Sequence, residues 1–299
     1  MTTADERFES GAREYAEYLR TVEGRLRLDI AWENFRSTLA GPGDGSRAAP
    51  VDANASGDAN NGELSNVSAD EPDGARDETR GARGFALDLG CGTGALALRL
   101  ARAGWSVSAA DASEAMIGIA REAARRAGCE DRVEFFRLDA ARAADAFGPR
   151  KFSAVVCHNV LEYVADPAQV VDAIGRVLAP GGLASLLARN RAGEALRDAV
   201  KRHDLDSAAR ALSAESARES LYGGPARLFD AGSLRALATG AGLRTVAARG
   251  VRVVADYLPA ALSETEELYA RLLDFELRLG ARADFAPVAR YVQLLARAG

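Results

Sequence analysis

The sequence predicts an α/β protein with a doubly wound sheet of seven mostly parallel strands, together with N-terminal helices and a helical insertion. Three observations predict this fold class. Between residues 84 and 190, short apolar segments alternate with amphipathic segments, which is the pattern of a parallel sheet covered by helices on both faces. A glycine-rich turn follows the first of these strands. Two more strand-like segments lie near the C-terminal end.

The expected elements follow one another at short intervals. Apolar segments of strand length lie at residues 84–90, 105–111, 132–140, 151–160, 183–189, 243–257 and 288–297. Amphipathic segments of helix length lie at residues 94–104, 113–128, 166–182 and 263–279. Because the first five strands alternate with helices, right-handed crossovers are expected to connect them.

Several helix boundaries are visible in the sequence. Gly104 is expected to end one helix, and Ser113 to cap the next. The Pro-Gly-Gly segment at 180–182 is expected to stop the helix that begins at 166. The helix at 263–279 is expected to bury one apolar face, made of Leu268, Leu272, Phe275 and Leu279.

The chain is expected to divide into three parts. These are an N-terminal helical cap at 1–40, a disordered acidic insert at 41–80, and a main domain at 81–299 with a substrate-side insertion at about 190–228. The insert holds nine acidic residues and three arginines, a net of −6 in a chain of formal charge −5. It has few large apolar side chains to offset the entropy of ordering it. We interpret it as a solvated linker, with a regulatory docking segment as the alternative.

Composition excludes several classes of protein. No apolar run approaches the ~18 residues of a membrane span, and the polar start lacks a signal-peptide core. Cys91, Cys129 and Cys157 are widely spaced and form no CxxC pair. The sequence therefore indicates a cytoplasmic protein with reduced, buried cysteines and neither a zinc site nor a disulfide.

The stretch "ALDLGCGTG" at 86–94 is the clearest candidate for a binding site. Its glycines, at 90, 92 and 94, follow a strand that contains Asp88, and a bare backbone at that place lets a ligand approach. A tight turn without a ligand is the alternative. With Ala95 the spacing also satisfies a dinucleotide-binding fingerprint. Asp111, at the end of the second strand, suits either ribose hydroxyls or the cap of the helix that follows.

Two later features distinguish among these alternatives. Asp139 and Ala140 close the third strand, and the polar segment "CHNVLEYVADP" at 157–167 closes the fourth. Together with the glycine turn, Asp111 and "LAPGG" at 178–182, they resemble the class I S-adenosylmethionine-dependent methyltransferase family over about residues 84–190. The resemblance implies a Rossmann-like domain that binds S-adenosylmethionine.

Each matching position then has an expected role in holding this cofactor. Asp88 would lie near the methionine amino group, Asp111 would bind the ribose, and Asp139 with Ala140 would bind the adenine. The resemblance implies further cofactor contacts from the turn and from the end of the fourth strand, namely Gly90, Cys91, Gly92, Gly94, His158 and Asn159. A structural histidine is the alternative for His158.

A narrower resemblance extends beyond this region. Residues 8–35, "GVRVVADYL" at 250–258 and "ARYVQLLAR" at 289–297 resemble parts of the bacterial tRNA 5-carboxymethoxyuridine methyltransferases. That family esterifies the carboxylate of a modified wobble uridine. By position, Arg27 would reach the methionine carboxylate, although an arginine on an amphipathic helix is more often a solvated cation. tRNA is accordingly the expected partner.

Candidate acceptor residues lie in the last third of the chain. A carboxylate acceptor needs no base at neutral pH, so cationic and donor groups should hold it; our candidates are Arg252, Tyr257, Arg290 and Tyr291, with ordinary strand-surface positions as the alternative. For a hydroxyl acceptor, His158 is the candidate catalytic base. The segment 203–220 holds four acidic residues, two arginines and no lysine, so tRNA phosphates would be contacted by dispersed arginines: Arg189, Arg191, Arg197, Arg202, Arg227, Arg252 and Arg290.

Two other functions remain open at this point. The first is a small-molecule O-, C- or N-methyltransferase that acts on a quinone precursor or a secondary metabolite. The second is a cofactor-binding interaction module without catalysis. No metal is expected in any of these cases.

Overall fold

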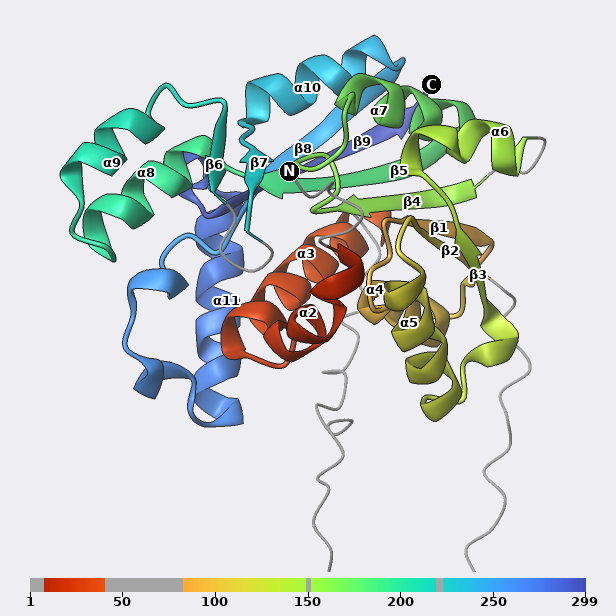
Figure 1. Ribbon diagram of the computed structural model, residues 1–299, viewed down its shortest axis with the longest axis horizontal. Coiled ribbons are helices and arrows are strands. Elements are labelled where there is room, and N and C mark those ends of the chain that lie inside the picture. Colours follow the sequence, from red (N-terminus) through yellow and green to blue (C-terminus); the bar gives the residue numbers. More distant parts are fainter. Residues whose placement is uncertain (1–7, 41–82, 149–151, 219–222) are drawn as a thin grey trace, which may run out of the picture.

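The computed structural model describes residues 8–40, 83–148, 152–218 and 223–299, and the insert predicted at 41–80 lies outside this part of the chain. A seven-stranded sheet with the order β3-β2-β1-β4-β5-β9-β8 forms its centre (Figure 1). The strands are β1 Phe85–Leu89, β2 Ser106–Asp111, β3 Val133–Arg137, β4 Phe152–His158, β5 Leu178–Arg189, β8 Leu243–Val251 and β9 Tyr291–Ala298. In this sheet β9 runs in the direction opposite to that of the other six strands. The predicted fold class is confirmed.

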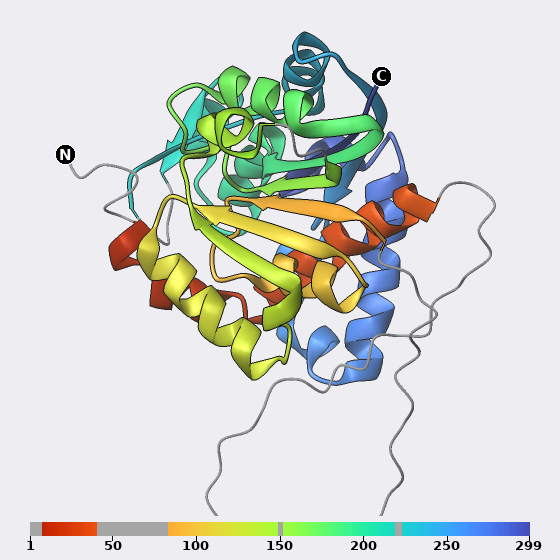
Figure 2. The ribbon, with the colours of Figure 1, turned by 90° about the vertical axis from the view of Figure 1, so that its right-hand side faces the viewer.

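Helices cover both faces of the sheet (Figures 1 and 2). One face carries α6 Ala143–Phe147, α7 Pro167–Val177 and α10 Ala231–Gly240. The other carries α3 Val22–Ala40, α4 Ala95–Arg102 and α5 Glu114–Arg126. The strand order reverses between β1 and β4, and a doubly wound sheet binds its ligand beyond the carboxyl ends of the strands at such a point.

Of the remaining elements, α2 Ala12–Tyr18 lies beside α5 (Figure 2). The others lie at the side of the sheet that carries β5, β9 and β8 (Figure 1). They are α8 Arg191–Val200, α9 Leu205–Ala211, α11 Glu266–Ala281 and a small hairpin of β6 Ser216–Arg218 and β7 Pro225–Arg227. In the described part of the chain, no helix is both long and apolar enough to cross a bilayer.

Capping residues set the helix boundaries largely as expected. Ser113 accepts a hydrogen bond from the backbone N–H of Met116 at 3.2 Å and so caps α5. The end predicted for the helix at 166–182 is wrong, because α7 ends at Val177. The Pro-Gly-Gly segment lies inside β5, where Phe152 pairs with Leu178 but Ala154 pairs with Leu183. Residues 179–182 therefore form a bulge that lets both leucines stay in the core.

The buried face of α11 differs from the apolar pattern of its sequence. Phe275 is 42% exposed, whereas Tyr269 and Glu276 are buried beside Leu272 and Leu279. Glu276 accepts hydrogen bonds from three successive backbone N–H groups, those of residues 253–255. Burying these polar partners rotates the helix away from the face that hydrophobicity alone predicts.

The strand predicted at 243–257 is also shorter than expected. β8 ends at Val251, and a 3-10 turn occupies residues 255–257. Arg252 follows the strand with a positive φ of 60°. The backbone therefore turns at the edge of the sheet, and the hydrogen bonds to Glu276 hold the turn.

Candidate cofactor and acceptor site

The glycine turn leaves β1 at the point where the strand order reverses. Gly90 has a φ of 76°, and a Cβ atom there would lie 2.1 Å from Cγ2 of Val160. A Cβ at Gly94, with φ 81°, would lie 2.9 Å from Cβ of Ala120. Both positions need glycine for backbone conformation and for packing. A Cβ at Gly92 would lie 3.1 Å from the ring of Tyr15, which belongs to α2, so the N-terminal segment covers the turn.

Asp111 and Asp139 lie at the ends of neighbouring strands, as expected. The Asp111 carboxylate accepts hydrogen bonds from the backbone N–H groups of Gly92 at 2.8 Å and Ser113 at 2.9 Å. It therefore ties the glycine turn to the start of α5. Asp139 accepts from the backbone N–H of Ala141 at 2.9 Å, beside the buried Ala140. Both carboxylates are fixed at the carboxyl edge of the sheet.

Asp88 is buried beneath the turn. Its Oδ2 atom has no hydrogen-bond partner among the described residues. Burial, followed by the nearby Asp111 carboxylate, raises the pKa of Asp88 to about 7. A buried carboxylate with an unsatisfied oxygen is suited to receive a cationic amino group. The methionine end of S-adenosylmethionine carries such a group, so this site fits the cofactor.

Arg27 enters the same site from α3 and is buried, not solvated. Its guanidinium donates to Oδ1 of Asn159 at 2.8 Å and to the hydroxyl of Tyr15 at 2.9 Å. With Asp88, Gly90, Cys91 and other residues, these side chains line a cavity of about 30 Å³. Asn159 has a φ of 56°, a conformation that asparagine tolerates better than most residues. The structure therefore brings Arg27, Asp88 and the end of β4 together.

His158 lines this cavity as well. Its Nε2 atom lies 2.8 Å from the hydroxyl oxygen of Ser185, on β5. Burial, and then the positive charge of Arg27, lowers the pKa of His158 to about 3. A histidine with so low a pKa is a weak proton acceptor. The burial of His158 and the contact of its Nε2 atom with Ser185 therefore argue against the base role expected for a hydroxyl acceptor.

A buried tyrosine connects the cofactor cavity to the candidate acceptor residues. The ring centroid of Tyr291, at the start of β9, lies 5.8 Å from Cζ of Arg27, 5.8 Å from Cζ of Arg252 and 5.7 Å from Cζ of Arg290. Burial opposes ionisation of Tyr291, but these arginines, with Arg189, lower its pKa overall. Three of the four predicted acceptor residues thus lie around one position.

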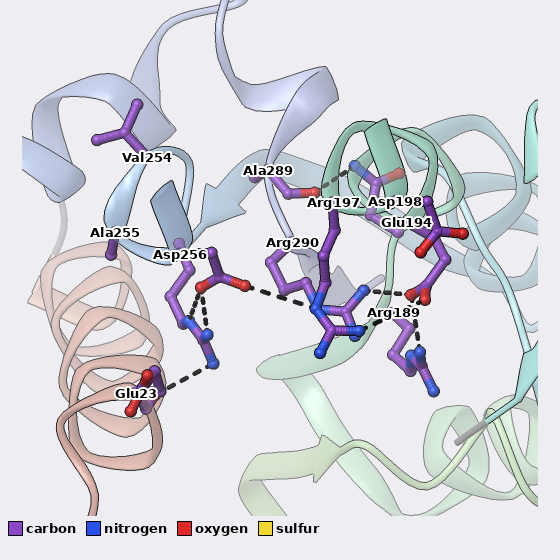
Figure 3. A network of polar contacts seen from close by, with 12 residues as sticks. Glu23, Arg189, Glu194, Arg197, Asp198, Val254, Ala255, Asp256, Ala289 and Arg290 are labelled. Carbon is purple, nitrogen blue, oxygen red and sulfur yellow. Dashed lines mark hydrogen bonds and ion pairs between the residues drawn. The ribbon is translucent and has the colours of Figure 1, made fainter. Parts of the chain in front are cut away.

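An ion-pair network holds these arginines in place (Figure 3). Glu194 of α8 accepts from Nη2 of Arg189 at 2.7 Å and also from Nη1 of Arg290. Asp256 accepts from Nε of Arg252 at 2.8 Å, and its other oxygen lies 4.0 Å from Nε of Arg290. The network therefore joins the insertion to β5, β9 and the turn after β8.

Tyr257, the fourth predicted acceptor residue, lies at the edge of this network. It is half-buried on the turn after β8. Burial, and then the adjacent Asp256 carboxylate, raises the pKa of Tyr257 to about 12. Its phenol stays protonated at neutral pH and is therefore a hydrogen-bond donor at the rim of the cluster.

Sequence reasoning gave Arg189 the wrong role and missed Glu194. Arg189 was expected to contact tRNA phosphates, but it is 4% exposed, and Arg252 and Arg290 are similarly buried. Atoms Nε and Nη1 of Arg189 have no hydrogen-bond partner among the described residues. Its position in the sequence could have indicated this role, because Arg189 ends β5 at the carboxyl edge of the sheet. Nothing in the sequence pairs it with Glu194.

The described residues contain no group of three or more acidic, histidine or cysteine side chains that is arranged to hold a metal ion. The polar side chains around the site are carboxylates, guanidinium groups, phenols and one imidazole. Such a set is suited to bind a zwitterionic cofactor and an anionic second ligand.

Comparisons with known proteins agree with this geometry. A family model described as a methyltransferase domain matches residues 86–182. The tRNA 5-carboxymethoxyuridine methyltransferase of Escherichia coli (strain K12) is 30% identical over 218 residues, which cover 71% of this chain and 78% of the relative. The ubiquinone biosynthesis O-methyltransferase of Methylococcus capsulatus (strain ATCC 33009 / NCIMB 11132 / Bath) is 40% identical over 106 residues, but these cover only 36% of this chain and 44% of the relative.

Among solved structures, one from Listeria monocytogenes described as an S-adenosylmethionine dependent methyltransferase has a TM-score of 0.51. It is 15% identical, and the match covers 73% of this chain and 91% of that chain. At this identity it supports the fold alone. The long match to the Escherichia coli relative, the domain match and the sheet order together show that this chain belongs to the class I S-adenosylmethionine-dependent methyltransferases and uses S-adenosylmethionine as its cofactor.

Proposed function

We propose that this enzyme methylates a carboxylate, and that its acceptor is the carboxylate of 5-carboxymethoxyuridine at the wobble position of tRNA. One observation carries the proposal. Four buried arginines, Arg27, Arg189, Arg252 and Arg290, lie around the cofactor cavity and Tyr291. Among the described residues, their ion-pair partners are Glu194 and Asp256. The buried Glu162 carboxylate also acts on Arg189, and Asp88 lines the cavity beside Arg27. Buried charge is costly unless paired, so two ion-pair partners for four guanidinium groups favour an anionic ligand.

We assign the cofactor contacts to the residues that already surround the cavity. Asp88 would receive the amino group, and Arg27 the carboxylate, of the methionine end. Asp111 would accept from the ribose hydroxyls, and Asp139 with Ala140 would contact the adenine. When bound, S-adenosylmethionine supplies an electrophilic methyl group on a positively charged sulfur.

The reaction then requires the protein mainly to align the methyl donor with the acceptor. A carboxylate oxygen of the acceptor forms the new O–CH₃ bond while the S–CH₃ bond breaks, and the electrons of that bond remain on sulfur. No proton is released, since the carboxylate is already ionised at neutral pH. Holding donor and acceptor in line can supply ~7 kcal/mol or more of the barrier reduction. The reaction therefore needs no base, which is consistent with the low pKa of His158.

The proposed acceptor residues are the donors around Tyr291. Arg189 has two unused buried donor atoms, and Arg290 is held beside it by their shared partner Glu194. Carboxylates bind arginine through charge-assisted hydrogen bonds. Tyr257 and Arg252 complete the group on the side of β8. The tRNA assignment is further supported by the relative from Escherichia coli, whose match extends over more than twice the length of the ubiquinone relative's match.

The decisive experiment is nucleoside mass spectrometry of tRNA from a strain that lacks this protein. The methyl ester of 5-carboxymethoxyuridine should disappear and the free acid accumulate, and wild-type protein should restore the ester. Purified protein with labelled S-adenosylmethionine should transfer the label to tRNA from that strain. An unchanged nucleoside profile in the deletion strain removes the tRNA assignment.

A second candidate is a small-molecule O-methyltransferase. The 40% identity to the Methylococcus capsulatus relative favours it. A hydroxyl acceptor needs a base, however, and His158 is poorly suited to that task. Label transfer to a phenolic extract fraction, with none to tRNA, would favour this candidate.

A further inference from the structure

A buried polar network lies beneath the cofactor cavity. It joins α3, β4, β5 and β9 through Asn34, His158, Ser185 and Gln293, and Ser185 and Gln293 are fully buried. Atom Nε2 of Gln293 lies 2.9 Å from both the carbonyl oxygen of Ala31 and the hydroxyl oxygen of Ser185. Nδ2 of Asn34 donates to Oε1 of Gln293 at 2.9 Å. Polar side chains buried this deeply are normally all hydrogen-bonded, so each donor in the network must face an acceptor.

The direction of each hydrogen bond follows from one fixed acceptor. The carbonyl of Ala31 can only accept, so the amide nitrogen of Gln293 must face it and donate. The second N–H of Gln293 then points to Ser185, whose oxygen accepts it. Within the described part of the chain, the other polar atom in reach of the Ser185 hydroxyl is Nε2 of His158, at 2.8 Å. The hydroxyl hydrogen is therefore donated to Nε2.

We propose that Gln293 and Ser185 are positioning residues that fix His158 as the neutral tautomer with its proton on Nδ1. In this tautomer the Nδ1–H has no acceptor among the residues that the structure describes, and His158 lines the cofactor cavity. His158 then acts as a hydrogen-bond donor to an oxygen of a bound ligand and takes no proton from the acceptor. This role rests on the cofactor placement proposed above, but not on the identity of the acceptor.

The same network opposes protonation of His158. An imidazolium would carry a hydrogen on Nε2, and the Ser185 hydroxyl hydrogen would then lose its acceptor. Arg27 and Asp88 both line the cavity with His158. The shift in the pKa of His158 comes from burial and then from the positive charge of Arg27, which acts in the same direction as the network. Asn159, the chain neighbour of His158, is uncharged. The donor role is therefore expected to hold across the neutral pH range.

Nuclear magnetic resonance can observe this tautomer directly. The chain has only two histidines, so long-range ¹H–¹⁵N correlation spectra of the ¹⁵N-labelled full chain give two imidazole patterns. A His203→Gln variant assigns them, because His203 is exposed and lies outside the site. We expect His158 to show the Nδ1–H pattern, unchanged between pH 5 and pH 8. An Nε2–H pattern, or titration of His158 near the ordinary pKa of about 6.5, overturns the proposal.

Variants of two buried serines test whether Ser185 fixes the tautomer of His158. Ser185→Ala should give a mixture of His158 tautomers and weaken S-adenosylmethionine binding by about three- to tenfold in calorimetry. Ser108→Ala is the matched control, because Ser108 is also fully buried in the sheet but its hydroxyl oxygen has no partner among the described residues. It should leave the tautomer unchanged. Equal spectra for both variants overturn the role of Ser185. The tRNA proposal is tested separately, by nucleoside analysis.

Discussion

Replacing Glu194 by glutamine removes the negative charge that lies between Arg189 and Arg290. Glu194 is 2% exposed. Despite the opposing effect of burial, the charges of Arg290 and Arg189 lower its pKa from 4.5 to about 2. That difference corresponds to about 3 kcal/mol of stabilisation of the folded state at pH 7. Breaking a buried ion pair on one side typically costs ~3–5 kcal/mol. We therefore expect Glu194→Gln to lower the free energy of unfolding by about 3 kcal/mol.

The pH dependence gives this prediction a sign that can be checked. Because the folded-state pKa of Glu194 is lowered, its contribution is fully present above the unfolded value of 4.5 and is lost as the pH falls through about 2. In urea denaturation, the gap between wild type and variant should shrink from about 3 kcal/mol at pH 7 to roughly 1 kcal/mol at pH 3. Glu267→Gln, on the exposed face of α11, is the control. If both variants unfold within ~0.5 kcal/mol of wild type at pH 7, the buried network contributes no stability and the reasoning is refuted.

Three further predictions concern the cofactor turn. Asp111→Ala should weaken S-adenosylmethionine binding at least tenfold in calorimetry, by loss of charge-assisted hydrogen bonds worth ~1.5–3 kcal/mol, whereas the exposed Asp172→Ala should not. With a pKa of about 7 for Asp88, binding should strengthen about tenfold from pH 6 to pH 8, and a flat profile would exclude an ionised Asp88 as the partner of the amino group. Gly128→Ala, a left-handed position with open space around it, should cost ~1–2 kcal/mol of unfolding free energy. Gly90→Ala should cost ~1–3 kcal/mol more because Val160 stands in the way, and equal losses would contradict that packing.

The sheet and most of its helices were predictable because their signals are local. Alternation of apolar strands with amphipathic helices identified all seven strands of the main sheet, and Ser113 was recognisable as a cap from its own sequence context. The errors arose where the local structure depends on residues that are distant in the sequence. The Pro-Gly-Gly segment became a bulge because Leu178 pairs with Phe152 across the sheet. The face of α11 turned because the backbone at 253–255 needs Glu276 as a hydrogen-bond acceptor.

The candidate site divides in the same way. The glycine turn, Asp88, Asp111 and Asp139 lie at strand ends, so strand order alone places them at one edge of the sheet. The acceptor side instead depends on contacts across long stretches of chain. Glu194 and Arg290 are 96 residues apart, and no periodicity in either segment indicates that they meet. Arg189 was visible as a cation in the sequence, but only its burial shows that it faces inward.

The charge balance of the site also bears on how a product would leave. On the proposed assignment, the acceptor carboxylate brings one negative charge to the buried arginines around Tyr291, and methylation converts it to a neutral ester. The guanidinium groups that favour the substrate then lose their charge-assisted hydrogen bonds, each worth more than a neutral one. At the same time the cofactor loses the positive charge on its sulfur. The cationic surplus therefore discriminates between acid and ester without contacts to the methyl group, and it favours binding of the unmodified acceptor over retention of the product.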